Sequence, residues 1–390
     1  MVEWSHRAVD KELVEATREV CKDFSLDYWR ECDQNSRYPE EFFRAAGEAG
    51  WLGALLPTKY GGTELGLPRM VDVLETITRS GAGMTGGITV NQALFPIQPL
   101  LRFGTEAQRE KYLPLVATGD LHVAFAVTEP DAGIDTSRIT TRAVLTGERY
   151  TVNGQKVYIS KAQRADRIVL LTRTMAREAV SKPTDGMTLL FAENNRSAIS
   201  IHPMDKLGTG AIDTNTMFID GLEVDASDRI GDESDGFTAL TAGLNAERIV
   251  LSAEALGTGM AAIDAAVKYA GERVVFGRPI GQNQGIQFPL AEAYGAIEAA
   301  RGLTREAAEA YEAGAPNTAV TANLALLTAA RAAFQACDSA LQVHGGAGYM
   351  KDFHIERLWR EVRLVQLAPV SQEMIKNFLA QRVLGLPRAY

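Results

Sequence analysis

The stretch LHVAFAVT, residues 121–128, marks the point where the periodicity of the sequence changes. Its odd-numbered residues, from Leu121 to Val127, alternate with smaller or polar ones, which is typical of a half-buried strand. Short segments of the same kind follow to about residue 228: RIVLLTRT, MTLLFAE, AISIHPM, NTMFIDG and LEVD. Because no helix-length segment separates them, the pattern predicts an antiparallel barrel or sandwich rather than a sheet of βαβ units.

A tight turn is predicted inside RYTVNGQKVYIS, residues 149–160. Asn153 and Gly154 join two alternating runs, and Asn-Gly is the strongest short signal for a two-residue hairpin. We therefore expect two paired strands, one on each side of this dipeptide.

The spacing of apolar residues is helical on both sides of this β region. DKELVEATREVCKDF and PEEFFRAAGEAGW precede it, with apolar residues at intervals of three and four. Alanine-rich helical patterns return after about residue 235 and allow four or five helices to pack closely. We therefore expect an α+β protein with an N-terminal helical domain (1–120), a middle antiparallel β-barrel or sandwich (121–230) and a C-terminal four-helix-type bundle (231–390).

The composition indicates a soluble globular protein, with 390 residues, 46% apolar, 23% charged and a formal net charge of −9. This acidic balance argues against nucleic acid and against an anionic membrane surface as partners. Cys21, Cys32 and Cys337 are too few and too scattered for a disulfide framework, which favours a reducing compartment. The N-terminal segment lacks the apolar core of a signal peptide, and no apolar run approaches the ~20 residues of a membrane span. We expect a cytoplasmic protein.

Common nucleotide, metal and hydrolase motifs are missing from the chain. There is no GxxxxGK[ST], no GxGxxG after a strand, no HExxH and no GxSxG. The five histidines show no metal-ligand grouping, so no metal site is expected.

A carboxylate in LNAERIVLSAEALG, residues 244–257, stands where helical spacing predicts burial. Glu247 shares a stripe with Leu244 and Leu251, and a buried carboxylate is costly unless it is neutralised, paired or used. The local pattern alone favours an ion pair with a structural role over a functional one.

Four stretches in this order resemble the acyl-CoA dehydrogenase flavoprotein family. They are AFAVTEPDAGIDTSR (124–138), similar to VTEPxAGSD; NGQKVYIS (153–160), similar to NGxKxWIT; ERVVFGRPIGQNQGIQF (272–288), similar to ERxxFGxxIxxxQ; and QVHGGAGYMKDFHIERLWREVR (342–363), similar to QxxGGxGYxxxxxxERxxRD. The resemblance covers roughly residues 10 to 388 and agrees with the helix–β–helix order.

This resemblance implies FAD as cofactor and a set of residues that bind it. Thr128 and the backbone of Val127 would meet the pyrimidine edge of the flavin, and Tyr158 and Ser160 replace the family's Trp and Thr beside the ring. Arg273 and Gln284 resemble the residues at the pyrophosphate and the ADP portion. The whole implied set is Phe125, Val127, Thr128, Tyr158, Ser160, Arg273, Phe276, Gln284, Gln342, Gly345, Gly346 and Ser371. In the family these contacts cross a subunit boundary, which implies a homotetramer.

The resemblance also indicates where the catalytic base lies. Most of the family carries it as a Glu after the RD motif, but here Pro369 stands at that position, and proline has neither a carboxylate nor an N–H. A minority branch, which includes isovaleryl-CoA and some long-chain dehydrogenases, carries the Glu immediately before an Arg on the helix that opens the C-terminal domain. Glu247-Arg248 resembles that pair, so Glu247 is expected to be the base.

Two departures from the family pattern bear on the substrate. Ile134 replaces a Ser that touches cofactor or CoA, and Asn245 replaces an acidic residue near the base. With Arg248, which would reach toward polar or phosphate parts of CoA, they form the expected substrate-binding set.

The implied reaction converts an acyl-CoA thioester to its trans-2-enoyl form. Glu247 would abstract the α-proton, flavin N5 would accept the β-hydride, and electron-transfer flavoprotein would receive the electrons. Short, branched or cyclic acyl groups are expected. The alternatives are an acyl-carrier-protein dehydrogenase, a desulfinase or an oxygen-using oxidase on the same scaffold, and a non-catalytic flavin-binding scaffold.

Overall fold

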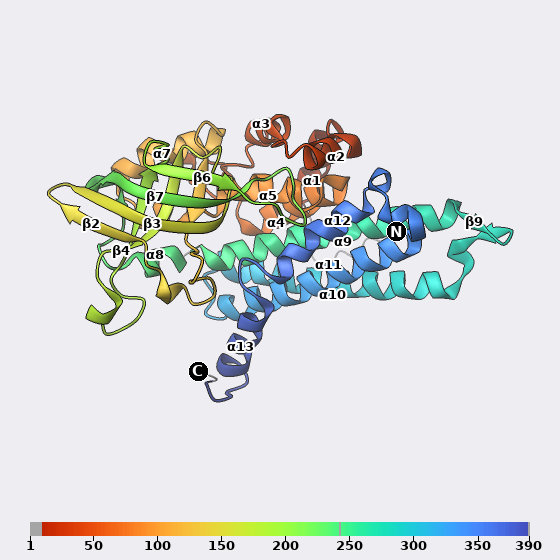
Figure 1. The fold of residues 1–390 in the computed structure, drawn as a ribbon. Helices are drawn as coiled ribbons and strands as arrows, with labels where there is room; N and C mark the ends of the chain where they lie inside the picture. The colour runs from red at the N-terminus through yellow and green to blue at the C-terminus, as the bar shows by residue number, and fades with distance from the viewer. Residues whose placement is uncertain (1–9, 242, 389–390) are drawn as a thin grey trace.

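The computed structural model describes residues 10–241 and 243–388, and the first nine residues of the predicted N-terminal segment lie outside this range. Figure 1 shows a β region at one end of an elongated molecule and a long helical bundle at the other, with the N-terminal helices packed against both. The predicted order of helical, β and helical regions is confirmed.

The N-terminal region is helical from its first described residues. Its helices are α1 (Lys11–Lys22), α2 (Leu26–Gln34), α3 (Glu40–Glu48), α4 (Leu67–Ile77), α5 (Gly83–Leu94), α6 (Gln98–Phe103) and α7 (Glu106–Thr118). Local sequence fixes several ends: Asp10 caps α1 by accepting the Leu13 N–H at 3.1 Å, and Thr105 forms a capping box with Gln108. A π-helical turn, Thr78–Ala82, joins α4 to α5.

The middle region is one eight-stranded sheet in the order β6-β7-β3-β2-β4-β5-β8, with β1 paired to β4. The strands are β1 (Val123–Ala126), β2 (Arg142–Thr146), β3 (Arg149–Ser160), β4 (Arg167–Arg173), β5 (Met187–Glu193), β6 (Ile199–Pro203), β7 (Thr214–Asp225) and β8 (Arg229–Ile230). Most neighbours are antiparallel, as predicted, whereas β1 pairs with β4 in parallel, and β2 meets β4 in the same sense.

The predicted hairpin at Asn153-Gly154 is wrong. β3 runs through both residues, and the hairpin turn lies earlier, where Thr146 pairs with Arg149 across two residues. A Cβ at position 154 would lie 2.5 Å from Thr141 Oγ1, so the glycine allows the backbone to lie close to Thr141. The same position borders a register shift between β3 and β7.

The C-terminal region is a bundle around a long central helix. Its helices are α8 (Gly236–Thr241), α9 (Leu244–Glu272), α10 (Gln284–Glu312), α11 (Thr318–His344), α12 (Ile355–Val362) and α13 (Gln372–Arg382), and a short pair of strands, β9 (Val274–Val275) and β10 (Arg278–Pro279), joins α9 to α10. Small residues allow the long helices to approach closely: a Cβ on Gly259 of α9 would lie 3.0 Å from Ala333 Cα on α11.

The region Gly236–Glu272, which includes α8 and α9, passes a length and composition test for a membrane span, although charged residues such as Glu254 interrupt its apolar runs. Its best window has a mean hydropathy of 1.3. However, 89% of that window is buried inside the protein, mainly against α11, α10 and α4. Its apolar character is therefore explained by its place at the centre of the bundle.

Candidate active site

Glu247 lies in the first turn of α9 and is 7% exposed. Burial raises the pKa of its carboxyl to about 7, and the neighbouring Arg248 guanidinium opposes that rise. The burial expected from its place on an apolar stripe is confirmed. The carboxyl can therefore exchange a proton near neutral pH, as a general base requires.

Arg248 does not neutralise Glu247 by direct pairing. Adjacent residues on a helix point about 100° apart, and Arg248 Nη1 instead donates to Asn245 Oδ1 at 2.8 Å, one turn earlier. In the described part of the chain, the buried Nε of Arg248 has no hydrogen-bond partner. This donor is therefore available to an acceptor that the protein itself does not supply.

The β1 end and the middle of β3 lie together, as the resemblance implies. Thr128 and Val157 are joined by the Thr128 hydroxyl, which donates to the Val157 carbonyl, and by the Val157 N–H, which donates to Thr128 O at 2.9 Å. Of the other implied residues here, Phe125 lies on β1 and Ser160 ends β3. The Thr128 hydroxyl thus already uses its proton within the protein, which leaves its oxygen as an acceptor.

Glu129 and Lys156 hold these two segments together, and the sequence analysis assigned them no role. Lys156 Nζ lies 2.9 Å from Glu129 Oε1 and donates to Val127 O at 2.9 Å, and both side chains are buried. Glu129 also accepts N–H bonds from Thr140 and Thr141 at 2.6 and 3.0 Å. Both residues occur within the quoted motifs, in VTEP and NGQK, so the opposite charges in these two motifs were the available signal.

The side chains of Tyr158 and Ile134 are exposed to solvent. Tyr158 is 66% exposed and has a φ of +62° inside a register shift of β3, a conformation that strains a non-glycine backbone. Ile134, in the segment between β1 and β2, is 67% exposed. An exposed aromatic ring held on a strained strand suits a surface that a planar ligand covers.

The remaining implied cofactor residues, apart from Ser371, lie at the opposite end of the bundle. Arg273 directly follows α9, Phe276 lies in the β9–β10 turn, Gln284 begins α10, Gln342 lies in the last turn of α11, and Gly345 and Gly346 directly follow that helix; all are exposed. Stacking of Tyr269 on His344, with ring centroids 4.4 Å apart, ties the ends of α9 and α11 together. Figure 1 shows this end, marked by β9, far from the sheet.

These residues cannot share one small ligand with Glu247 of the same chain. Arg273 is 26 residues beyond Glu247 along α9, a separation of about 39 Å at 1.5 Å per residue. The structure therefore brings the predicted residues together as two groups: the β region with Glu247, and the far end of the bundle.

Ser371 and Pro369 lie on neither group's helices. Ser371 caps α13, with its Oγ accepting the Met374 N–H at 3.4 Å, and Pro369 is exposed just before it. The hydroxyl of Ser371 thus has a local helix-capping role.

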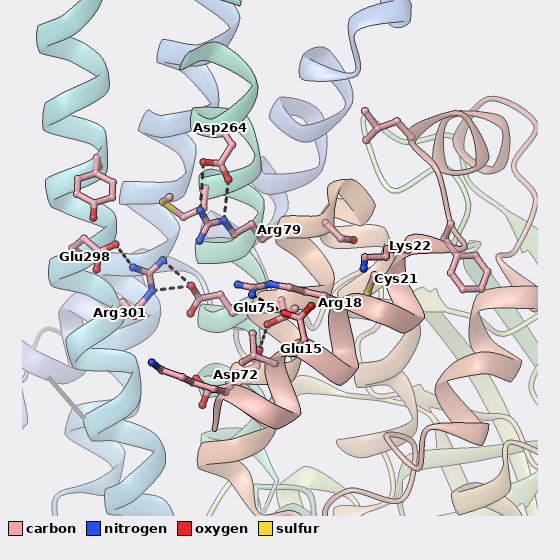
Figure 2. A pocket seen from close by; sticks show the side chains of 18 of the residues that line it. Glu15, Arg18, Cys21, Lys22, Asp72, Glu75, Arg79, Asp264, Glu298 and Arg301 are labelled. Carbon is pink, nitrogen blue, oxygen red and sulfur yellow. Dashed lines mark hydrogen bonds and ion pairs between the residues drawn. The ribbon is translucent and has the colours of Figure 1, made fainter. Parts of the chain in front are cut away.

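A separate cavity of about 1110 Å³ lies between α1, α4, α9 and α10, and contains none of the predicted site residues. Figure 2 shows that its charged side chains face one another, with Arg79 on Asp264 and Arg301 on Glu75 and Glu298. Because these charges are mutually paired, we assign no ligand to it. Among the described residues, no cluster of three or more His, Cys, Asp or Glu side chains is arranged to hold a metal ion.

Protein-family models match three successive parts of the chain. They describe the N-terminal domain of acyl-CoA dehydrogenase for residues 8–120, its middle domain for residues 124–222 and its C-terminal domain for residues 234–384. The matched regions span all three structural regions in the same order.

Similar proteins cover nearly the whole chain. The 3-(aryl)acrylate reductase of Clostridium sporogenes is 34% identical over 375 residues, which covers 95% of this chain and 98% of that protein. Acyl-CoA dehydrogenase FadE12 of Mycobacterium tuberculosis is 33% identical over 372 residues, covering 94% of each. Among solved structures, butyryl-CoA dehydrogenase from Megasphaera elsdenii matches with a TM-score of 0.91 and 28% identity, covering 98% of this chain and 100% of that one. The prolyl acyl carrier protein oxidase AnaB matches with a TM-score of 0.89 and 25% identity, covering 97% and 100%.

Proposed function

The chain belongs to the acyl-CoA dehydrogenase family, and from that premise we propose that it oxidises an acyl-CoA thioester to the trans-2-enoyl thioester, with Glu247 as the base. The observation that supports this role is a carboxyl 7% exposed, in the first turn of a core helix, with its pKa raised by burial to about 7. Pro369 cannot supply an alternative at the usual position.

The proposed chemistry on the protein side is a single proton transfer. The α C–H bond of the thioester breaks, its proton moves to a Glu247 carboxylate oxygen, and the β-hydrogen leaves as hydride. A bound FAD supplies the acceptor for that hydride. Closure of the site by the acyl group removes water from Glu247, which strengthens the base and protects the developing enolate charge.

The residues present fit a flavin dinucleotide. Tyr158 offers an exposed ring to the isoalloxazine, the Ser160 hydroxyl lies on the same strand, and the Thr128 oxygen lies just after β1, bonded to Val157 of β3. At the far end, a Cβ on Gly345 or Gly346 would meet nothing within 4 Å, so a ligand can approach the backbone there, beside the exposed Arg273.

The separation of the predicted site residues into two distant groups supports an oligomer. Since the far-end residues lie about 39 Å along α9 from Glu247, one cofactor can contact both groups only if a second copy contributes its far end. We therefore propose that each FAD lies between two chains of a cytoplasmic homotetramer. Electron-transfer flavoprotein is the proposed electron acceptor.

Related reactions on the same scaffold are the second candidate. The similarity to a 3-(aryl)acrylate reductase favours the reverse reaction, reduction of a 2-enoyl group, and the similarity to a prolyl acyl carrier protein oxidase favours a carrier-protein thioester and oxygen as acceptor. The absence of a hydroxyl at Ile134, where the family pattern has a Ser, agrees with altered carrier recognition.

The test is anaerobic bleaching of the protein-bound flavin by a panel of acyl-CoA and acyl-carrier-protein thioesters. The proposed function requires that at least one saturated thioester bleach the flavin, and that Glu247→Gln abolish bleaching while Glu373→Gln, an exposed glutamate on α13, does not. Peroxide formed in air without another acceptor identifies an oxidase. If the protein binds flavin tightly but no thioester reduces it, only the non-catalytic flavin-binding scaffold remains.

A further inference from the structure

A second buried glutamate lies on α9 beside Glu247 and has no part in the proposed chemistry. Glu254 is 0% exposed, and within the residues that the structure describes neither of its carboxyl oxygens has a hydrogen-bond partner. Burial, reinforced by the charge of Glu247, holds the pKa of Glu254 well above its usual value. A buried polar group without partners destabilises the protein, and a ligand that supplies a hydrogen-bond partner offsets this cost.

The two glutamates lie on one face of the helix. Seven residues are just under two helical turns, so Glu254 lies about 10 Å further along α9 than Glu247, in nearly the same direction around the axis. A ligand whose reacting carbon lies at Glu247 and whose chain follows α9 into the protein would therefore reach Glu254.

Helix α5 packs against α9 at the level of Glu254. A Cβ on Gly87 would lie 2.5 Å from Glu254 Cγ, and Gly243, near the start of α9, packs against Gln98, just beyond α5. The two helices therefore run antiparallel, and Asn91, one turn after Gly87, lies between the levels of Glu254 and Glu247. The Asn91 side chain opposes the rise in the pKa of Glu254, although its approach falls outside hydrogen-bond geometry.

Three buried side-chain oxygens in this part of α5 and α9 have no hydrogen-bond partner among the described residues: both carboxyl oxygens of Glu254 and Oδ1 of Asn91. An alkyl chain would leave all of them unsatisfied, whereas a group with several N–H or O–H bonds would satisfy them.

We propose that Glu254 and Asn91 bind a hydrogen-bond donor on the far part of the acyl group, so that the substrate is the thioester of an amino- or hydroxyl-bearing acid rather than of a plain fatty acid. This proposal rests on the proposed function, because it takes Glu247 as the site of the α-carbon. An ammonium group would pair with the Glu254 carboxylate, and a hydroxyl would accept the proton of the neutral acid or donate to its carbonyl oxygen.

The experiment compares three matched acyl groups: hexanoyl, ω-hydroxyhexanoyl and ω-aminohexanoyl. Their CoA thioesters give kcat/KM for flavin reduction, and their non-oxidisable CoA thioethers give Kd by perturbation of the flavin spectrum. We expect the wild type to favour the amino or the hydroxyl compound over hexanoyl by at least tenfold in both measurements, and the favoured one identifies the donor.

Variants assign the preference to Glu254. Glu254→Leu should reverse the preference, so that kcat/KM and affinity rise for the hexanoyl compound and fall for the two polar ones. In Glu254→Gln, the affinity for the amino compound should fall more than the affinity for the hydroxyl compound. Ser252→Ala is the matched control, because it removes a buried hydroxyl from α9 that donates to Arg248 O at 2.7 Å, and should leave the ratios unchanged.

Two results would overturn the assignment: wild-type protein that binds the hexanoyl thioether as tightly as both polar ones, or Glu254→Leu protein with unchanged ratios. The thioether measurement involves no turnover. Failure of the proposed dehydrogenation would thus appear as absent bleaching by every thioester, whatever the binding preference.

Discussion

Lys156 Nζ lies 2.9 Å from Glu129 Oε1, and the two side chains are 0% and 5% exposed. The pair joins β3 to the segment that follows β1, the two places from which Tyr158 and Thr128 would meet the flavin. Burial lowers the pKa of Lys156 to about 8, so the pair depends on Glu129 to keep the ammonium charged at neutral pH.

Lys156→Met should destabilise the protein by about 3–5 kcal/mol, because it leaves the Glu129 carboxylate buried without its cation. The free energy of unfolding in urea measures this loss. Lys376→Met, which removes an exposed partner of Glu373, is the control and should cost less than about 1 kcal/mol. The double variant Lys156→Met/Glu129→Gln should recover part of the loss, and an unchanged deficit in it would mean that packing, not charge, dominates.

Glu247→Gln should make the protein less active and more stable. The pKa of Glu247 is raised from 4.5 to about 7 in the folded state, so the folded protein binds more protons than the unfolded chain between these values, and stability falls as pH rises through that window. Above pH 7 the substitution should therefore add up to about 3 kcal/mol of stability, and below pH 4 the gain should vanish.

The rate of flavin reduction by a saturated thioester should depend on the ionisation of Glu247. It should rise with pH and level off above an apparent pKa near 7, because only the ionised carboxyl accepts the α-proton. Glu247→Gln should lower it by about 10²–10⁴-fold. A pH-independent rate in the wild type would assign the base to another group.

Tyr158→Ala should weaken flavin binding by about tenfold, the loss expected for one aromatic stacking contact. Tyr158→Phe should retain affinity, since the proposed contact with the flavin is made by the ring and not by the hydroxyl. Because the side chain is 66% exposed, the unfolding midpoint of the flavin-free protein should hardly change. Equal flavin affinity in all three proteins would remove Tyr158 from the cofactor site.

Mixing two inactive variants should restore activity if each site draws on two chains. Glu247→Gln lacks the proposed base and Arg273→Ala lacks a proposed cofactor contact at the far end, yet an oligomer that contains both variants would have sites with Glu247 from one chain and Arg273 from the other. Flavin reduction measured after co-refolding of tagged chains tests this. Verified mixed oligomers without activity would contradict the shared site.

The sequence was informative where a local signal and the tertiary environment agree. The change of periodicity at Leu121 located the β region, and the apolar stripe through Leu244 and Leu251 predicted that Glu247 is buried. In contrast, Asn153-Gly154 resembles a hairpin turn in sequence but lies inside a strand. Its glycine is explained by the neighbouring Thr141, which leaves no room for a Cβ at position 154.

Other features depend on contacts that no spacing rule reveals. The pairing of Lys156 with Glu129 joins residues 27 apart across strands, and the missing partners of Glu254 follow from how α5 lies against α9. The apolar window in Gly236–Glu272 is rich in alanine and glycine, which are only weakly hydrophobic but permit close helix packing in the bundle.

The length of α9 has a genetic consequence. This helix of 29 residues carries the proposed base at one end and is followed at the other by the proposed cofactor contact, and these ends serve different active centres under the proposed assembly. A chain altered at the far end would then impair its neighbour's centre, while its own centre is completed by the neighbour's intact far end. Alleles that are defective at opposite ends of this helix are therefore expected to complement each other when expressed together.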